Sequence, residues 1–209
     1  MLQGLVTSGT AWVSRLALLN LLWLAASLAG LGVFGVFPAT LAAFQLVRDW
    51  RHRPKSAEQP YVRRYLKLVL DRAASGNLWG YGVLAVGYVI YVGISVAATA
   101  DYLALRIPVL GLLIAAGMAL LSVVVHLPFM LAHVEASWRH LIRASLFYGF
   151  THPLGTMLVV ASGLALSFVF GRWPALAFFF TISPMVMLTV SIDLVGYQKL
   201  QYRATAASR

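Results

Sequence analysis

Five long windows without a formal charge constrain this chain more than any other feature of its sequence. They cover residues 16–47, 73–100, 107–134, 144–171 and 173–192, with lengths of 32, 28, 28, 28 and 20 residues. A helix needs about 20 apolar residues to cross a hydrocarbon core of about 30 Å, so each window holds one crossing. Only a helix satisfies its own backbone hydrogen bonds in lipid when the sequence does not alternate with polar residues. The windows predict an all-α polytopic membrane protein.

The composition excludes the other broad classes of protein. Of the 209 residues, 61% are hydrophobic and only 11% are charged, whereas about 25% of the residues of a soluble domain are charged. An aromatic content of 12% excludes a disordered chain. The chain has no cysteine, which excludes disulfides, thiolate nucleophiles and cysteine-based metal sites. Nearly the whole chain is needed to cross the bilayer, so we interpret residues 1–209 as a single integral membrane domain.

The positions of the basic residues predict an orientation for five membrane-spanning helices. The helices are expected at about 16–47, 78–100, 107–132, 153–170 and 174–195. Of the 16 Lys and Arg residues, 13 lie in the segments 48–72, 139–143 and 199–209, and the others are Arg15, Arg106 and Arg172. Short positively charged loops stay in the cytoplasm. The amino terminus is therefore predicted outside, with the carboxyl terminus, a basic loop at 48–75 and a basic tail at 197–209 inside.

The basic loop contains a predicted amphipathic helix over about residues 60–75. At 100° per residue, Val62, Tyr65, Leu66 and Val69 share one face of this helix, which favours binding at the membrane interface. The cations expected at the membrane surface are Arg51, Arg53, Lys55, Arg63, Arg64 and Lys67. A formal net charge of +10 is also compatible with nucleic-acid binding. Such binding needs a basic surface that stands clear of the lipid, and we expect none in this chain. Docking of a soluble partner on residues 51–67 stays open.

Prolines and polar side chains interrupt the apolar windows. Pro38, Pro128 and Pro184 lie inside the first, third and fifth predicted helices, where proline kinks or breaks a helix. The polar residues expected within the membrane are Asn20, His126 and Asp193, and Asp193 is expected to pair or to snorkel near the inner end of its helix. Broken helices are common in transporters. Ordinary interhelical hydrogen bonding explains the same residues.

Histidines recur every seven residues at His126, His133 and His140. On one helix they would form a stripe with about 10.5 Å between neighbours, too far apart to share a metal ion. A proton relay along the stripe is the alternative use. The sequence has no nucleophile elbow, phosphate loop, dinucleotide fingerprint or zinc-protease motif. We therefore predict no enzyme activity, no cofactor and no metal.

The amino-terminal part contains Leu-Asn-Leu-Leu-Trp-Leu at 19–24, Gly32, Gly-Val-Phe-Pro-Ala-Thr at 35–40 and Arg-Asp-Trp at 48–50. Together these segments resemble the signature of the YesL-like family of bacterial membrane proteins, with weaker likeness at 64–80 and 141–155. Members of the family are often encoded beside carbohydrate-uptake ABC transporters. The resemblance therefore implies an accessory part in sugar import. The signature residues carried over, without a known role, are Asn20, Trp23, Pro38, Arg48 and Trp50.

Two functions follow as hypotheses for a multi-pass protein of the bacterial plasma membrane. The first is a non-enzymatic accessory protein that binds a membrane transport complex, with sugar ABC transporter subunits as the expected partners beside the lipid bilayer. The alternative is a small transporter or channel, acting as a homodimer, whose broken helices surround a polar path through Asn20, His126 and Asp193. A polar cavity at the depth of the prolines favours transport, and a dry bundle favours the accessory protein.

Overall fold

The computed structural model describes residues 2–52, 61–99, 103–134 and 136–207, with side chains described for residue 10 and within 12–51, 61–99, 104–134 and 136–195. The described residues form helices joined by short connections, and they contain no strand. The helices are α1 (Leu2–Ala29), α2 (Val36–His52), α3 (Tyr61–Asp71), α4 (Ala73–Thr99), α5 (Leu103–His133), α6 (Trp138–Thr151), α7 (Pro153–Arg172), α8 (Pro174–Phe180) and α9 (Ser183–Ala207).

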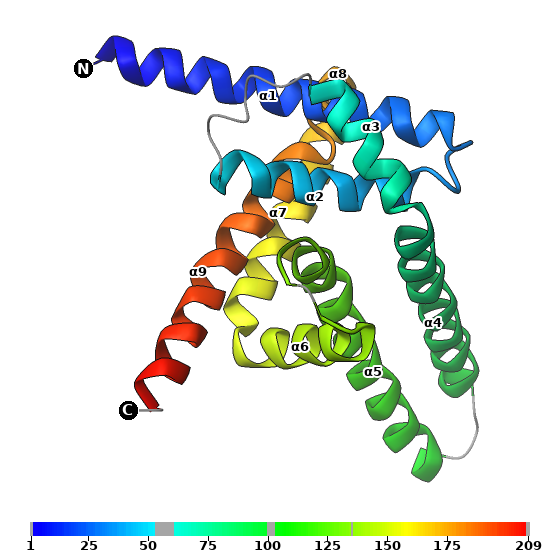
Figure 1. Cartoon of the computed structure of the whole chain (residues 1–209). Coiled ribbons are helices and arrows are strands. Elements are labelled where there is room, and N and C mark those ends of the chain that lie inside the picture. Colours follow the sequence, from blue (N-terminus) through cyan, green and yellow to red (C-terminus); the bar gives the residue numbers. More distant parts are fainter. Residues whose placement is uncertain (1, 53–60, 100–102, 135, 208–209) are drawn as a thin grey trace.

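The predicted class, an all-helical membrane protein, is confirmed. Four helices of the described chain are long and apolar enough to cross a membrane, in the segments 12–29, 73–99, 104–133 and 153–172. A fifth span is formed by α8 and α9 if the bent pair, which turns by 54°, counts as one. Figure 1 shows α1, α2 and α3 stacked across one end of the molecule, with the α4–α5 hairpin descending on one side and α9 on the other.

The first predicted span, 16–47, is wrong as a single helix. Helix α1 ends at Ala29 and α2 begins at Val36, so the chain reverses within the charge-free window. Glycines make the turn tight, since a Cβ on Gly30 would lie 2.4 Å from the Cα of Gly35, and one on Gly35 would lie 2.6 Å from two carbonyl oxygens of α1. Leu31 and Gly32 have φ angles of 56° and 73°, a left-handed conformation that glycine adopts at little cost. Hydropathy alone cannot distinguish this hairpin from one long helix.

The hairpin brings the two ends of the 16–47 window to the same end of the helix pair. Trp12 on α1 and Trp50 on α2 meet edge to face, with ring centroids 6.3 Å apart, and Figure 1 shows α2 running back along α1. Opposite sides were predicted for Arg15 and Arg48 because one crossing was expected between them. That premise fails, and the sides on which the two termini lie stay predictions.

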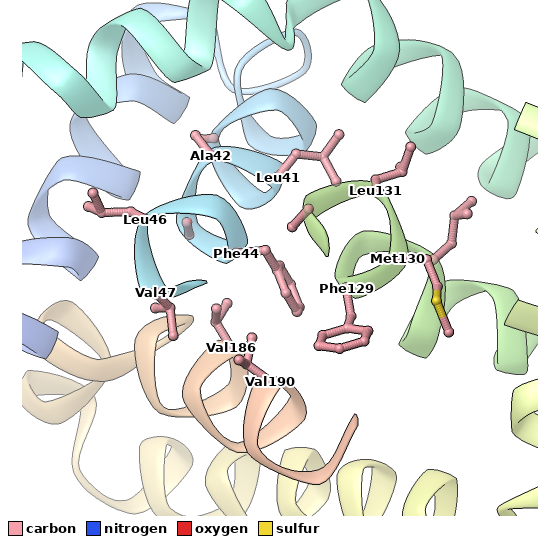
Figure 2. Packing of buried hydrophobic residues seen from close by; sticks show 14 of the residues in the cluster. Leu41, Ala42, Phe44, Leu46, Val47, Phe129, Met130, Leu131, Val186 and Val190 are labelled. Carbon is pink, nitrogen blue, oxygen red and sulfur yellow. The ribbon is translucent and has the colours of Figure 1, made fainter. Parts of the chain in front are cut away.

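Helix α2 is the centre of the molecule, and it packs against α1, α3, α4, α5 and α9. Residues 41–47 of α2 are all buried. Figure 2 shows Phe44 of α2 pointing toward Phe129 of α5, with Val186 and Val190 of α9 beside them. A helix with so little lipid contact needs no uniformly apolar surface, which is why α2 carries Gln45 and Arg48 and is too short and polar to count among the spans.

The predicted amphipathic helix is present as α3, but its buried face differs from the prediction. Tyr65 is fully buried and its hydroxyl donates to the Ala39 carbonyl over 2.8 Å, while Leu68 and Val69 pack against the same core. Val62 and Leu66 are instead 48% and 46% exposed. The periodicity was ambiguous because α3 carries apolar residues on two faces, one against α2 and one turned outward.

Helices α4 and α5 form an antiparallel hairpin that contacts the rest of the molecule mainly at one end. Of their spanning segments, only 11% and 6% of the residues are buried. The contacted end is the basic one, because α3 and Arg72 precede α4 there and α6 with Arg139 follows α5. Helix α9 continues to Ala207, so most of the predicted 197–209 tail is helical.

Candidate functional site: polar joints within the bundle

A buried histidine–aspartate pair joins α5 to α9. His126 Nδ1 lies 3.0 Å from both carboxylate oxygens of Asp193, and both side chains are 0% exposed. The other ring nitrogen, Nε2, lies 2.8 Å from the Thr156 hydroxyl of α7. Every polar atom of the imidazole therefore has a partner, and three helices far apart in sequence are tied together. Asp193 therefore forms a pair, which is one of the two alternatives that the sequence predicted for it.

Helix α6 closes this joint from a further side. The Tyr148 ring meets the His126 ring edge to face at 4.9 Å, and its hydroxyl donates to the Asp193 carbonyl over 3.3 Å. Burial, with Asp193 as the second cause, raises the pKa of Tyr148 above its usual range, so its phenol stays neutral. Gly149 permits the close approach of α6, since a Cβ there would lie 1.8 Å from the Ser122 hydroxyl.

The order carboxylate, imidazole, hydroxyl is the order in which an imidazole takes a proton from a nucleophile. Acyl transfer also needs donors for an oxyanion and access for water. Thr156 lines an apolar surface groove of about 430 Å³ between α5, α6 and α7. The one other polar side chain among its lining residues is Ser122, whose hydroxyl already donates to the Ser145 carbonyl over 2.8 Å. The arrangement is suited to holding helices together rather than to hydrolysis.

A second polar joint lies at the break between α8 and α9. Phe178 C=O and Ile182 N–H would bond to each other in an uninterrupted helix. Instead the Asn20 amide stands between them, with Nδ2 donating to the Phe178 carbonyl over 2.8 Å and Oδ1 accepting from the Ile182 N–H over 2.8 Å. One side chain of α1 thus replaces the missing backbone hydrogen bond, which matters because lipid offers no substitute.

The three predicted kink prolines have different settings. Pro184 is the second residue of α9, directly after the 54° bend, so its predicted break is present. Pro128 lies inside α5, which continues through it. Pro38 does not interrupt a helix, because it lies in the first turn of α2, where a missing N–H costs nothing.

The signature residues Trp23, Arg48 and Trp50 lie at contacts of α2. The Trp23 indole N–H donates to the Thr40 hydroxyl over 3.0 Å. Arg48 donates to the carbonyl of Ala132, in the last turn of α5, where carbonyls lack helical partners. Trp50 is buried between Trp12 and Tyr61.

The predicted surface cations that the structure describes fall into two groups, those with a partner and those exposed on α3. Arg64 forms an ion pair of 2.6 Å with Asp49, and Arg51 donates to the Ser191 hydroxyl over 2.5 Å. Arg63 and Lys67 are exposed on α3, beside the outward-facing Val62 and Leu66. Arg53 and Lys55 lie outside the described residues. The pair made by Arg64 was not predicted, because its partner lies 15 residues away on another helix.

The predicted histidine stripe does not exist on one helix. Helix α5 ends at His133, which bonds to the Phe129 carbonyl over 2.9 Å, and His140 belongs to α6. Thr156 and Tyr148 were missed as partners of His126. No sequence signal marked them, because a threonine and a tyrosine in apolar helices have no characteristic spacing from the histidine that they contact.

The chain is similar to one protein family over its amino-terminal part and to two known proteins over most of its length. Residues 16–94 match the family described as "Protein of unknown function, DUF624". The chain is 25% identical over 193 residues to "Uncharacterized protein YesL" of Bacillus subtilis (strain 168), covering 92% of this chain and 89% of the relative. It is 28% identical over 172 residues to "Uncharacterized protein YteU" of the same organism, covering 82% and 76%. The chain is therefore similar to YesL and YteU over most of its length, in agreement with the resemblance seen in the sequence.

The matched region gives the YesL-like signature a structural meaning. Residues 16–94 contain the glycine turn, all of α2 and α3 and most of α4. Asn20, Trp23 and Arg48 act there as contacts between helices rather than as an exposed site. The His126–Asp193 pair lies beyond residues 16–94. No solved structure matches the chain.

Proposed function

We propose that this YesL-like protein is a non-enzymatic accessory protein of the bacterial plasma membrane that binds a membrane transport complex through α4. The observation that carries the proposal is a pair of tyrosines. Tyr88 and Tyr91 lie near the middle of the spanning segment of α4, and each is 68% exposed. Their hydroxyls make no hydrogen bond within the described part of the chain, unlike Tyr81, whose hydroxyl donates to the Val33 carbonyl over 2.8 Å.

A tyrosine hydroxyl facing lipid tails lacks any partner, and transfer of such a group into an apolar medium costs about 1–3 kcal/mol on protein-based scales. Helix α4 has 27 residues, so it is about 40 Å long and exceeds the hydrocarbon core by about 5 Å at each end. Tyr88 lies 11 residues before Thr99, about 16 Å from the outer end of the helix, which is within the core. A polar acceptor on a partner's transmembrane helix removes this cost.

The transport alternative has less support. His126 and Asp193 are 0% exposed and satisfied by one another, and Asn20 is used at the helix break. Three of the described cavities along α4, α5 and α7 are apolar grooves on the surface. The polar cavity beside Arg48 and Arg72 is small, about 190 Å³, and lies at one end of the α4–α5 hairpin rather than forming a path through the bundle. The part of the proposal that concerns carbohydrate rests on the family resemblance, whose members are often encoded beside sugar importers.

Site-specific photo-crosslinking in native membranes tests the proposal. A photoreactive residue in place of Tyr88 is expected to capture a membrane subunit of a carbohydrate importer in cells grown on the corresponding sugar. Phe168 on α7 is the matched control, because it is also an exposed aromatic residue of a spanning helix. Products with lipid alone, or with a second copy of this chain, contradict the proposal, and the second product favours the homodimer alternative.

A hydroxyl deletion gives a finer test in mild detergent. The double variant Tyr88→Phe/Tyr91→Phe keeps both rings and removes only the two oxygen atoms. It is expected to retain several-fold less of the importer subunit on co-purification, because each interhelical hydrogen bond within a membrane contributes about 0.6 kcal/mol on average. Undiminished retention means that these hydroxyls are not the contact.

A further inference from the structure

A small polar cavity lies at the basic end of the α4–α5 hairpin. It has a volume of about 190 Å³ and is lined by residues of α2, α4, α5 and α6, including Arg48, Arg72 and Ser75. The Arg48 guanidinium donates to the Ala132 carbonyl. With the Gln45 amide oriented by its hydrogen bonds, its oxygen accepts from Arg72 Nε over 2.8 Å. Both arginines are half-buried.

The hydrogen-bond partners of these two arginines are neutral. Within the described residues, the ion pairs are Arg64 with Asp49 and His126 with Asp193, so neither cavity arginine has a carboxylate partner there. Glu135, which follows the lining residue Val134 in sequence, lies outside the described residues. Each guanidinium has five N–H donors, of which most remain for a ligand. Two guanidiniums beside one small cavity are suited to a phosphate group.

An apolar groove continues from this cavity along the hairpin. The adjoining cavity of about 430 Å³ shares Trp138 with the polar one. A third cavity, of about 500 Å³, shares Val86, Leu120 and Val123 with the second. Along α4 the lining residues progress from Ser75 to Ile90, a length of about 22 Å at 1.5 Å per residue. One leaflet contributes about 15 Å of hydrocarbon, half of a core of about 30 Å.

We propose that the Arg48–Arg72 cavity and the α4–α5 groove together bind one anionic phospholipid, with the phosphate between the arginines and an acyl chain along the groove. A free phosphate does not need the groove, and an apolar helix does not need two half-buried cations at its end. Trp138 lies at the junction of the two, where indoles favour the boundary between headgroups and acyl chains. The lipid site is independent of the proposed partner surface, because Tyr88 and Tyr91 lie on another face of α4 and line none of these cavities.

Lipid titration of the purified full chain, followed by native mass spectrometry or thermal shift, tests the headgroup part. Phosphatidylglycerol is expected to bind at least about tenfold more tightly than phosphatidylcholine with the same acyl chains, and Arg72→Gln to remove most of that preference. The matched controls are Arg139→Gln and Arg143→Gln, which remove an exposed cation from the same end outside the cavity. Equal effects of all three variants overturn the site, because they indicate a non-specific charge effect.

Two glycines give a matched pair for the groove. A Cβ on Gly82, which lines the groove, or on Gly111, which does not, meets nothing within 4 Å, so both tolerate a larger side chain. Gly82→Leu is expected to weaken long-chain phosphatidylglycerol binding several-fold, whereas Gly111→Leu leaves it unchanged. Short-chain phosphatidylglycerol and inorganic phosphate are expected to be insensitive to Gly82→Leu.

Three further results overturn the proposal. If inorganic phosphate competes as well as the long-chain lipid, the site binds a free anion. If Gly82→Leu and Gly111→Leu behave alike, the groove does not hold the chain. If the native protein shows no preference for phosphatidylglycerol and Glu135→Gln creates one, the chain itself neutralises the arginines.

Discussion

The polar groups of the bundle centre differ from those on the outer face of the α4–α5 hairpin in whether they have hydrogen-bond partners within the chain. In the centre, His126, Asp193 and Asn20 each have partners from other helices of the same chain. On the hairpin, the hydroxyls of Tyr88 and Tyr91 make no hydrogen bond within the described residues, and Gly82 faces open space. The side chains of His126, Asp193 and Asn20 are satisfied within one chain. The outer face of the hairpin therefore carries two hydroxyls without a partner among the described residues.

This difference separates residues that hold the fold from residues that serve interactions. Removing a polar group from the centre leaves its buried partner unsatisfied, which destabilises the chain itself. Removing one from the outer face of the hairpin is expected to change only what the chain binds. Unfolding of the purified protein in mixed micelles measures the first effect, and binding experiments measure the second.

The largest expected effect comes from the His126–Asp193 pair. His126→Leu or Asp193→Leu alone is expected to lower the free energy of unfolding by about 3–5 kcal/mol, because each leaves the other group buried without its partner. The double variant His126→Leu/Asp193→Leu is expected to recover a large part of that loss, since an apolar pair replaces an ionisable one. Additive losses in this double-mutant cycle would show that the two side chains do not act as a unit.

Asn20 is expected to have the next largest effect. Asn20→Leu leaves the Phe178 carbonyl and the Ile182 N–H without partners, at a cost of about 2 kcal/mol or more. Hydrogen exchange at the Ile182 amide should accelerate at the same time. Ser14→Ala is the control on the same helix, because the exposed Ser14 hydroxyl bonds only to the Thr10 carbonyl within α1. Unchanged exchange at Ile182 would contradict the role assigned to Asn20.

Alanine substitutions in the glycine turn at 30–35 and on the α4–α5 hairpin are expected to change the free energy of unfolding in opposite directions. Gly30→Ala places a Cβ against the Gly35 backbone and is expected to cost about 1–3 kcal/mol. Gly82→Ala fills open space on an exposed helix and is expected to stabilise by about 0.5–1 kcal/mol, because alanine has the higher helix propensity. The free energies of unfolding of the two variants should therefore move in opposite directions.

The smallest expected contrast compares two hydroxyl deletions. Tyr65→Phe removes the buried hydrogen bond to the Ala39 carbonyl and is expected to cost about 1 kcal/mol. Tyr88→Phe is expected to stay within about 0.5 kcal/mol of the native protein. Burial raises the pKa of Tyr65 above its usual range, so the stability that its neutral phenol contributes is lost only above about pH 10, where the unfolded phenol ionises. Tyr65→Phe should remove this alkaline dependence, which a pH series measures.

The spans and the breaks could be predicted to different extents from the sequence. Predicted boundaries at 78–100, 107–132 and 153–170 agree with α4, α5 and α7 within a few residues, because charges and hydropathy determine where a helix can lie in lipid. The break at Pro184 was predicted for the same local reason, the missing N–H. The turn at 30–35 was not, because its glycines are as apolar as the helices around them and only their mutual contact defines the reversal.

The sequence by itself determined that this chain is helical and suited to lipid, and it located the apolar helices α4, α5 and α7, because those properties are sums over local residue types. Only the tertiary structure decided that α2 returns along α1, that Asn20 completes a broken helix in another part of the chain, and that His126 meets Asp193 and Thr156. These contacts join residues 30 to 162 positions apart. No local pattern encodes such distances, since helix packing selects each partner only when the whole chain has folded.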